Sequence, residues 1–308
     1  MRIGIFFGTM GSSSTLDGLI QQIVDVEDDG FDSFWTANVS RTDALTVVAL
    51  GGQPTSRIEM GTAVVPTFPR HPTAMAQQAL TTNAATNGRL ILGIGLSHQP
   101  NVENRWGLKF ETPGQHMEEY MTILRSMVDT GKVDFDGSLF NVHAEVDRVS
   151  TDPMTVCIAA LAPRMLRIAG EMAQGTITWM VGPTTLDTHI VPRITRSAES
   201  AGREAPRVCV GLPICVTDDR SAAFERAGEF FQNYGNLPSY RRMLDIEGVE
   251  SPAEVAIIGN ESEVEAQLRA LSDAGATDYL ASIFPEGDDS AASFDRTRAL
   301  LKGLVGKL

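Results

Sequence analysis

The stretch IEMGTAVVPTFPRHPTAMAQQALTTNAATNGRLILGIGLSH, residues 58–98, decides the fold. Residues 61–65 form an apolar run that predicts a strand. Pro72 suits the first turn of a helix, because the backbone N–H that proline lacks would have no partner there, and we expect that helix over residues 74–85. Residues 90–95 predict a second buried strand. The stretch is therefore a β-α-β unit, and parallel folds of such units keep their chemistry at the strand ends.

The same alternation of strands and helices continues along the chain. Ser14 with Asp17 resembles a capping box, and Asn260 caps a clear amphipathic helix near the end. A hairpin over residues 133–142 and a helical excursion around residues 240–244 interrupt the alternation. The expected strands cover residues 3–7, 31–37, 61–65, 90–95, 154–160, 176–181, 208–216 and 278–284. This pattern predicts one (β/α)₈ TIM-barrel domain over residues 1–308, and an open doubly wound sheet is the alternative.

Composition limits the classes of function. The chain has 308 residues, of which 43% are hydrophobic, so it can bury a large core as a globular enzyme. No run of about 18 apolar residues predicts a membrane span, and no signal-peptide pattern precedes the first strand. The net charge of −14 argues against nucleic acid or an anionic membrane as a partner. Cys157, Cys209 and Cys215 show no pairing motif, which favours reduced thiols in a cytoplasmic protein.

Several common motifs are absent from the sequence. Residues 93–98 begin like a dinucleotide-binding fingerprint, but His98 stands where the third glycine is needed. There is no Walker lysine motif, no His-Glu-x-x-His motif and no Gly-x-Ser-x-Gly elbow. The five histidines are scattered, so no metal site is expected.

The segments that follow the strands are the candidate site in a barrel. An ordinary solvated loop is the competing interpretation for any single residue in them. Residues 160–164 stand out, because small residues lead into Pro163 at the first position of a helix, where free amides form a natural phosphate cradle. The full set comprises residues 8–12, 38–41, 63–68, 96–101, 159–164, 180–183, 217–220 and 284–286.

Five segments together carry a resemblance to a known family. They are GTAVVP (61–66), RHP (70–72), GIG (93–95), IAALAP (158–163) and the strand that begins near Gly175. In this order they resemble the bacterial luciferase-like family, and within it the deazaflavin (coenzyme F420)-dependent oxidoreductases of actinobacteria and methanogens. The resemblance covers nearly the whole chain and implies a (β/α)₈ barrel with insertions.

The resemblance implies roles for individual residues. A non-prolyl cis peptide at Ala63–Val64 would support the middle of the cofactor ring, and Val65 follows it. His98 lies where relatives keep a proton-transferring carboxylate, so it is the catalytic candidate, although a loop histidine that faces outward is equally common. The remaining implied cofactor contacts are Asn38 at the ring or ribityl edge, Asn101 as an amide contact, and Ala160, Leu161, Ala162, Arg164 and Gly182 at the phosphate.

At two positions this chain differs from sugar-phosphate dehydrogenases of the family, which narrows the expected function. Val39 stands where sugar-phosphate dehydrogenases of the family have a catalytic histidine, and Pro183 stands near an expected substrate-phosphate lysine, so glucose 6-phosphate oxidation is not expected. The first hypothesis is hydride transfer between C5 of F420 and a small organic substrate. An apolar lining suggests that this substrate is hydrophobic. The lining residues would be Val39, Val65, Phe68 and Met180.

Two other hypotheses are compatible with the sequence. One is an FMN-dependent luciferase-like monooxygenase, and the other is a non-catalytic flavin-binding relative. The partner expected in each case is a small molecule. A homodimer is also among the assemblies to expect, because relatives often dimerise. The identity of the substrate is not encoded in any motif of residues 96–110 or 234–255.

Overall fold

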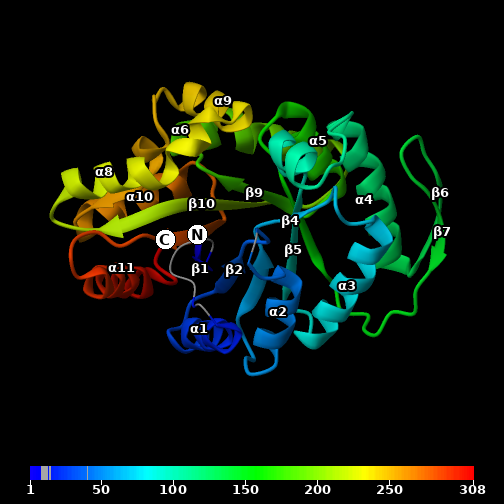
Figure 1. Ribbon diagram of the computed structural model, residues 1–308, viewed down its shortest axis with the longest axis horizontal. Helices are drawn as coiled ribbons and strands as arrows, with labels where there is room; N and C mark the ends of the chain where they lie inside the picture. Colours follow the sequence, from blue (N-terminus) through cyan, green and yellow to red (C-terminus); the bar gives the residue numbers. More distant parts are fainter. Residues whose placement is uncertain (8–12, 14, 40) are drawn as a thin grey trace.

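Eight parallel strands close into the expected barrel in the described part of the chain, and the open-sheet alternative is wrong. We describe a computed structural model of residues 1–7, 13, 15–39 and 41–308 (Figure 1). The barrel strands are β1 (Arg2–Phe7), β2 (Ser33–Thr36), β3 (Glu59–Thr62), β5 (Leu90–Gly95), β8 (Thr155–Ala159), β9 (Gly175–Trp179), β10 (Arg207–Val216) and β12 (Asp278–Ile283). The last strand pairs with the first, with Arg2 opposite Asp278, and β9 pairs with β10, so the ring of eight strands is closed.

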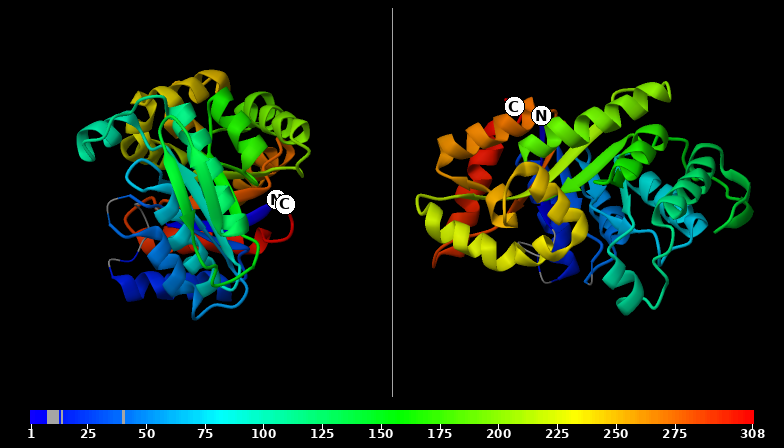
Figure 2. Two further views of the ribbon diagram at one scale, coloured as in Figure 1. Left: turned by 90° about the vertical axis from the view of Figure 1, so that its right-hand side faces the viewer. Right: turned by 90° about the horizontal axis from the view of Figure 1, so that it is seen from above.

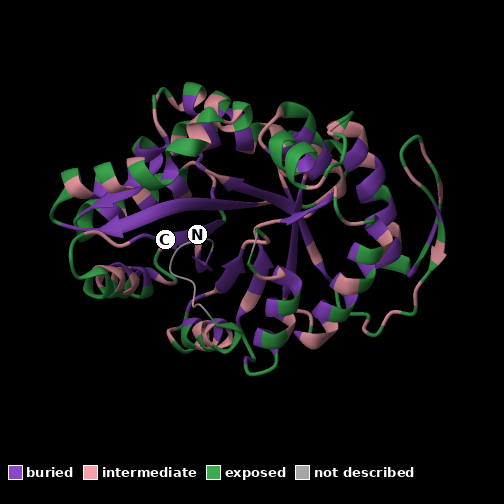
Figure 3. Cartoon of the chain, viewed as in Figure 1, coloured by how far each residue is buried: buried purple, intermediate pink, exposed green. Residues whose placement is uncertain are grey.

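Helices surround the barrel and bury their apolar faces against it (Figure 3). The predicted cap at Ser14 lies outside the described residues, and Thr15 caps the first helix by accepting a hydrogen bond from the Gly18 N–H at 3.1 Å. The predicted cap at Asn260 is confirmed, with a complete capping box. The α-helices are α1 (Leu16–Asp28), α2 (Ala44–Gly52), α3 (Pro72–Ala85), α4 (Pro113–Thr130), α5 (Pro163–Met172), α6 (Pro183–Thr185), α7 (Val191–Ser200), α8 (Arg220–Phe231), α9 (Pro238–Glu247), α10 (Glu261–Asp273) and α11 (Ser290–Leu304).

Two additions extend the barrel. The predicted hairpin is β6 (Lys132–Asp136) with β7 (Asn141–Glu145), and it projects beyond α4 on one side of the molecule (Figures 1 and 2). The predicted helical excursion is larger than expected. It comprises η3 (Gln232–Asn236), α9, η4 (Pro252–Val255) and the short strand β11 (Ile257–Gly259), which pairs with β10. A π-helical turn, η2 (Leu186–Ile190), joins α6 to α7, and another, η1 (Asn101–Arg105), follows β5.

The strand expected over residues 61–65 is divided in two. β3 ends at Thr62, and β4 (Val65–Pro66) resumes the pairing with β5. The Thr62 side chain bridges the interruption, because its hydroxyl accepts from the Gly93 N–H at 2.9 Å and donates to the Gly93 carbonyl at 2.8 Å. A Cβ at Gly93 would lie 1.9 Å from the Thr62 carbonyl oxygen, so only glycine permits this approach.

Glycines inside the barrel make room for two tryptophans. A Cβ at Gly61 would lie 2.1 Å from the Trp35 ring, and a Cβ at Gly211 would lie 2.9 Å from the Trp179 ring. Alternate residues of a barrel strand face inward, so each large ring needs a small neighbour on the next strand. The interior cluster consists of Phe6, Trp35, Ile91, Cys157, Ile177, Cys209 and Leu280.

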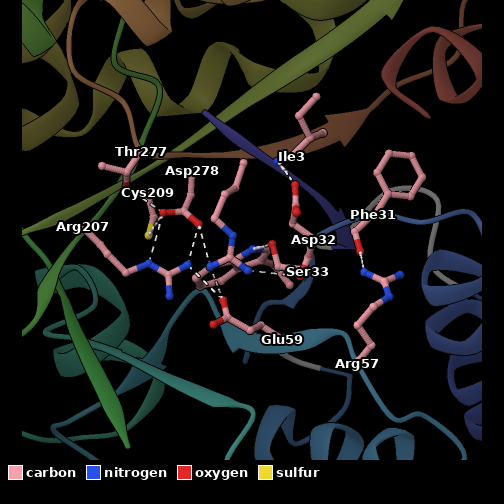
Figure 4. A network of polar contacts seen from close by, with 12 residues as sticks. Ile3, Phe31, Asp32, Ser33, Arg57, Glu59, Arg207, Cys209, Thr277 and Asp278 are labelled. Atoms are coloured by element: carbon pink, nitrogen blue, oxygen red, sulfur yellow. Dashed lines mark hydrogen bonds and ion pairs between the residues drawn. The ribbon is translucent and has the colours of Figure 1, made fainter. Parts of the chain in front are cut away.

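Four charged residues close the N-terminal end of the barrel (Figure 4). Arg207 pairs with Asp278 at 2.5 Å and with Glu59 at 3.1 Å, and Arg2 pairs with Glu59 at 2.7 Å. Only 2% of the Asp278 side chain is exposed, so the carboxylate depends on these cations. We call Arg2, Glu59, Arg207 and Asp278 the basal ion network.

The cysteines, the lengths of the helices and the two chain ends complete the description of the fold. The three cysteines are buried and unpaired, as predicted. None of the helices in the described ranges is long and apolar enough to cross a membrane. The two ends of the chain meet, because the Met1 amino group donates a hydrogen bond to the Leu308 carbonyl (Figures 1 and 2).

Candidate active site

The C-terminal end of the barrel interior is open to solvent. Ala37, Ala63, Val64 and Trp179 pack against the interior cluster and are partly exposed, whereas the cluster residues below them are buried. Ala159 is also partly exposed and ends β8. We call these five residues the barrel mouth. Its floor is apolar, and four of the five side chains are aliphatic.

The end of β3 supplies the centre of this floor. The peptide bond between Ala63 and Val64 is cis, so that expectation is confirmed. A Cβ at Gly95 would lie 2.7 Å from Val64 Cγ2 and 3.1 Å from Ala159 Cβ, which shows how closely these strand ends approach one another. Val65 is fully buried in the outer core, so only its backbone can meet a ligand.

Most of the side chains expected to form an apolar lining do not reach the mouth. Met180 is fully buried in the outer core, as Val65 is. Phe68 stacks on His116 of α4, with ring centroids 4.1 Å apart. Val39 is 50% exposed and remains available. Of the residues named from the sequence, Ala63 and Val64 therefore lie at the mouth, whereas the side chains of Val65 and Met180 do not.

Asn38 joins β2 to α2. Its Oδ1 accepts a hydrogen bond from the Ala44 N–H at 3.0 Å, which positions the first turn of α2. Its Nδ2 makes no hydrogen bond to the described residues, so this side chain can still donate one to a ligand.

His98 and Asn101 lie in the loop that leaves β5. Ser97 has a positive φ of 63°, which turns the chain, and the His98 carbonyl accepts from the Asn101 N–H at 2.9 Å. The Asn101 side chain is exposed and donates to Ser97 Oγ at 3.3 Å. The His98 ring is half-buried and packs against Tyr240 of α9, with centroids 5.5 Å apart. Burial lowers the pKa of His98, so its imidazole is neutral at neutral pH.

The turn before α5 has the free donors expected of an anion cradle. Ala162 is the N-cap and offers no side-chain acceptor, and Pro163 occupies the first helical position. The N–H groups of Arg164 and Met165 make no hydrogen bond to any described residue. The Arg164 side chain turns away to Glu118 at 2.7 Å, so it offers its backbone rather than its guanidinium.

The rest of this turn is fixed by contacts that the sequence did not reveal. Ala160 is buried, and the Thr176 hydroxyl donates to its carbonyl at 3.4 Å. The Leu161 carbonyl accepts from Nε2 of His189 at 2.8 Å. His189 therefore carries a proton on Nε2 at this contact, and burial lowers the pKa of its ring.

The second expected phosphate turn, at Gly182, is beside an acidic side chain. Glu247 of α9 accepts hydrogen bonds from the Thr184 N–H at 3.1 Å and the Thr185 N–H at 2.8 Å. A Cβ at Gly182 would lie 2.4 Å from the Glu247 carboxyl carbon. Glu247 thus occupies the amides of α6, and nothing in the local sequence connects it with Gly182.

Other site features lie in the helical excursion or outside the described residues. Tyr234 and Tyr240 of the excursion pack beside Trp179 and His98, although no motif marked them. The segment 8–12 expected at the first strand end lies outside the described residues, as does Ser40. Among the residues with described positions, no group of His, Cys, Asp and Glu could hold a metal ion.

Comparisons with known proteins agree with the barrel. A putative coenzyme F420-dependent oxidoreductase of Mycobacterium tuberculosis is 26% identical over 303 residues, which cover 93% of this chain and 85% of that protein. The structure of an F420-dependent secondary alcohol dehydrogenase with an F420-acetone adduct has a TM-score of 0.80 at 17% identity and covers 97% of both chains. A type II Baeyer-Villiger monooxygenase of Pseudomonas putida in complex with FMN has a TM-score of 0.75 at 16% identity, covering 99% of this chain and 97% of that chain.

The family model described as luciferase-like monooxygenase matches residues 1–288, which is most of the chain. The arrangement of the strands and their order along the sequence are those that the resemblance implied. The chain therefore belongs to the luciferase-like monooxygenase family.

Proposed function

We propose that the protein is an oxidoreductase that binds coenzyme F420 at the barrel mouth and transfers a hydride between the cofactor and a small organic substrate. The observation that carries this proposal is an apolar floor, Ala63, Val64 and Ala159, with the free amides of the α5 turn in the neighbouring strand-to-helix connection. A flat ring with a phosphate on its side chain needs these two features. The family membership and the F420-dependent relative support it.

The residues present fit such a group. Ala63, Val64 and Ala159 would contact the face of the ring, and the Arg164 and Met165 N–H groups would bind the phosphate. The deazaflavin would supply C5 as the donor or acceptor of a hydride, chemistry that no side chain provides. Asn38 can orient a ligand through its free Nδ2.

His98 is the proposed proton-transferring residue. Its imidazole is held half-buried by Tyr240 and is neutral at neutral pH, because burial lowers its pKa. A neutral imidazole can accept a proton at one nitrogen while it donates from the other. Asn101, Leu161, Ala162 and Gly182 remain proposed cofactor contacts of the surrounding turns.

The cradle at α5 allows a sharp test. In an Ala162→Asp variant, the new carboxylate would cap α5 and occupy the amides that the phosphate needs. We expect a gain of about 1 kcal/mol in the free energy of unfolding from the new cap. We also expect F420 to bind at least about tenfold more weakly, since charge-assisted hydrogen bonds of about 1.5–3 kcal/mol are lost and like charges meet.

The measurement is a fluorescence titration of oxidised F420 with the wild-type protein, Ala162→Asp and the uncharged counterpart Ala162→Asn. The three affinities should fall in the order wild type, Asn, Asp, while thermal unfolding shows that both variants are folded. Equal affinities would show that the α5 turn does not bind the phosphate of F420. Tight binding of FMN without binding of F420 would contradict the cofactor assignment itself.

An FMN-dependent monooxygenase is the second candidate, because FMN also combines a flat ring with a phosphate and a structurally similar monooxygenase binds it. Oxygen consumption with reduced FMN would distinguish it, and tight binding without turnover would indicate a non-catalytic flavin-binding relative. We further propose a single domain over residues 1–308, a cytoplasmic location, to which the three unpaired thiols conform, and a homodimer as the assembly to test.

A further inference from the structure

Four aromatic rings from three separate parts of the chain form a continuous row beside the barrel mouth. Trp179 ends β9, Tyr234 and Tyr240 belong to the helical excursion, and His98 leaves β5. Successive ring centroids are 5.9 Å, 5.2 Å and 5.5 Å apart in that order. We call these four residues the aromatic row. Because Trp179 also packs on Phe6 of the barrel interior, at 5.7 Å, the row is anchored to the mouth.

Tyr240 carries one of the polar atoms of this row that have no hydrogen-bond partner among the described residues. Its hydroxyl makes no hydrogen bond to any described residue. The Trp179 indole N–H is buried and approaches the Tyr234 hydroxyl without reaching hydrogen-bond geometry. Burial raises the pKa of Tyr240, and the neighbouring Tyr234 adds to the effect, so the Tyr240 phenol stays protonated and able to donate. Tyr240 is half-buried, so its hydroxyl is available to donate a hydrogen bond to a ligand held against the row.

No charged side chain in the described part of the chain makes a hydrogen bond or an ion pair with a ring of the aromatic row. The pKa of His98 is lowered by burial alone, and the pKa values of Tyr234 and Tyr240 are shifted by burial and by other aromatic residues. A carboxylate or phosphate on a substrate would find no counter-charge here and would lose its hydration. The row therefore favours an uncharged ligand with a flat face.

We propose that Tyr240 is a catalytic residue whose hydroxyl donates a hydrogen bond to the carbonyl oxygen of an uncharged, planar, conjugated substrate, such as an enone or a quinone, held against the aromatic row. This inference rests on the proposed hydride transfer. It adds a donor that lies in the excursion, a segment without a recognisable motif, and it narrows the class of substrate.

The atoms and electrons of the step balance between the substrate, the cofactor, Tyr240 and solvent. Bound, reduced F420 would supply the hydride for the new C–H bond, and the π electrons of the conjugated system would move to the carbonyl oxygen. The oxygen then takes the proton of the Tyr240 hydroxyl, and the phenolate regains a proton from solvent, with His98 as the adjacent relay. A donor placed where negative charge develops stabilises the transition state more than the ground state.

The test compares two substitutions that each delete one hydroxyl. Tyr240→Phe removes the proposed donor and keeps the ring. Tyr120→Phe is the control, because the Tyr120 hydroxyl likewise has no hydrogen-bond partner among the described residues but is buried in α4, among Phe140 and His116. Binding of menadione, a planar quinone, is followed through quenching of tryptophan fluorescence, and 2-cyclohexen-1-one is the second probe. Both are measured on protein saturated with oxidised F420 and on protein without it.

We expect Tyr240→Phe to bind menadione about 3- to 10-fold more weakly and to reduce it about 100-fold more slowly, with F420 affinity within about twofold of the wild type. Tyr120→Phe should match the wild type in menadione affinity, in the rate of menadione reduction and in F420 affinity. Equal menadione binding by Tyr240→Phe and wild type overturns the role of Tyr240. A wild-type protein that binds neither probe overturns the substrate class. Failure of the wild-type protein to bind F420 contradicts the proposed function and not the role of Tyr240. In that case, menadione binding by the wild type and by Tyr240→Phe, both without F420, still tests Tyr240.

Discussion

Single residues decide where backbones and rings can approach one another. Gly61 admits the Trp35 ring and Gly93 admits the Thr62 carbonyl, and in each case a Cβ would lie about 2 Å from its neighbour. His116 is a third example, because its ring is 8% exposed, stacks on Phe68 and shares a hydrogen bond of 3.0 Å with the Thr67 hydroxyl. In each case a neighbour from another element fixes what the residue does.

His116 predicts a pH dependence of stability. Burial lowers its pKa to about 4, although Glu119 opposes the shift. The unfolded chain takes up this proton near its ordinary pKa, so the stabilisation is complete above about pH 6.5 and is lost as the pH falls toward 4. We expect the free energy of unfolding to fall by about 2 kcal/mol between pH 7 and pH 5 through this group. Urea denaturation at both pH values measures it.

A His116→Gln variant provides the comparison, since Gln keeps a hydrogen bond to Thr67 and does not titrate. Its free energy of unfolding should fall less between pH 7 and pH 5 than that of the wild type, by the same amount of about 2 kcal/mol. Parallel pH curves for the two proteins would show that His116 is not held neutral by burial.

At the scale of elements, the helical excursion is the least regular part of the fold and contributes most to the proposed substrate site. Residues Tyr234 and Tyr240 come from η3 and α9, and α9 lies beside α6 (Figure 1). Glu247 at the end of α9 accepts from the Thr184 and Thr185 N–H groups, so it attaches the excursion to the barrel. A carboxylate at a helix N-terminus is favoured both by the free amides and by the helix dipole.

A Glu247→Ala variant should loosen this attachment. We expect a loss of about 1 kcal/mol in the free energy of unfolding, because two amides of α6 lose their acceptor. Hydrogen exchange should become faster in α6 and α9 and stay unchanged in β1 and β12. Glu250→Ala is the control, since Glu250 is an exposed residue whose contacts are made by its backbone. Unchanged exchange in α9 would show that apolar packing alone holds the excursion.

At the scale of the whole molecule, the residues that stabilise the barrel and those of the proposed active site lie at opposite ends. The basal ion network closes the N-terminal end, and the mouth with the aromatic row lies at the C-terminal end. Asp278 is buried beside Arg207, whose pKa it raises, and it also accepts a long contact of 3.7 Å from the Cys209 thiol. Removing one member of a buried ion pair costs more than the pair contributes, because the other charge is left buried.

An Asp278→Asn variant should therefore lose about 3–5 kcal/mol in the free energy of unfolding, and its F420 affinity at permissive temperature should stay within about twofold. Thermal unfolding and the fluorescence titration measure the two quantities. Asp129→Asn is the control, because it breaks the surface pair with Arg125 and should cost less than about 0.5 kcal/mol. A large loss of F420 affinity in folded Asp278→Asn would show that the two ends are coupled.

The sequence by itself determined the barrel, the positions of most strands and helices, the cap at Asn260 and the α5 turn, because these depend on local periodicity and on proline and glycine. It also placed the cis peptide at Ala63–Val64 through a family resemblance. Only the tertiary structure decided that Val65 and Met180 face the outer core, that Glu247 occupies the amides of α6 and that Tyr240 meets His98. These contacts join residues far apart in the chain, and their partners are selected by packing and by the pairing of buried polar groups, which leave no local pattern in the sequence.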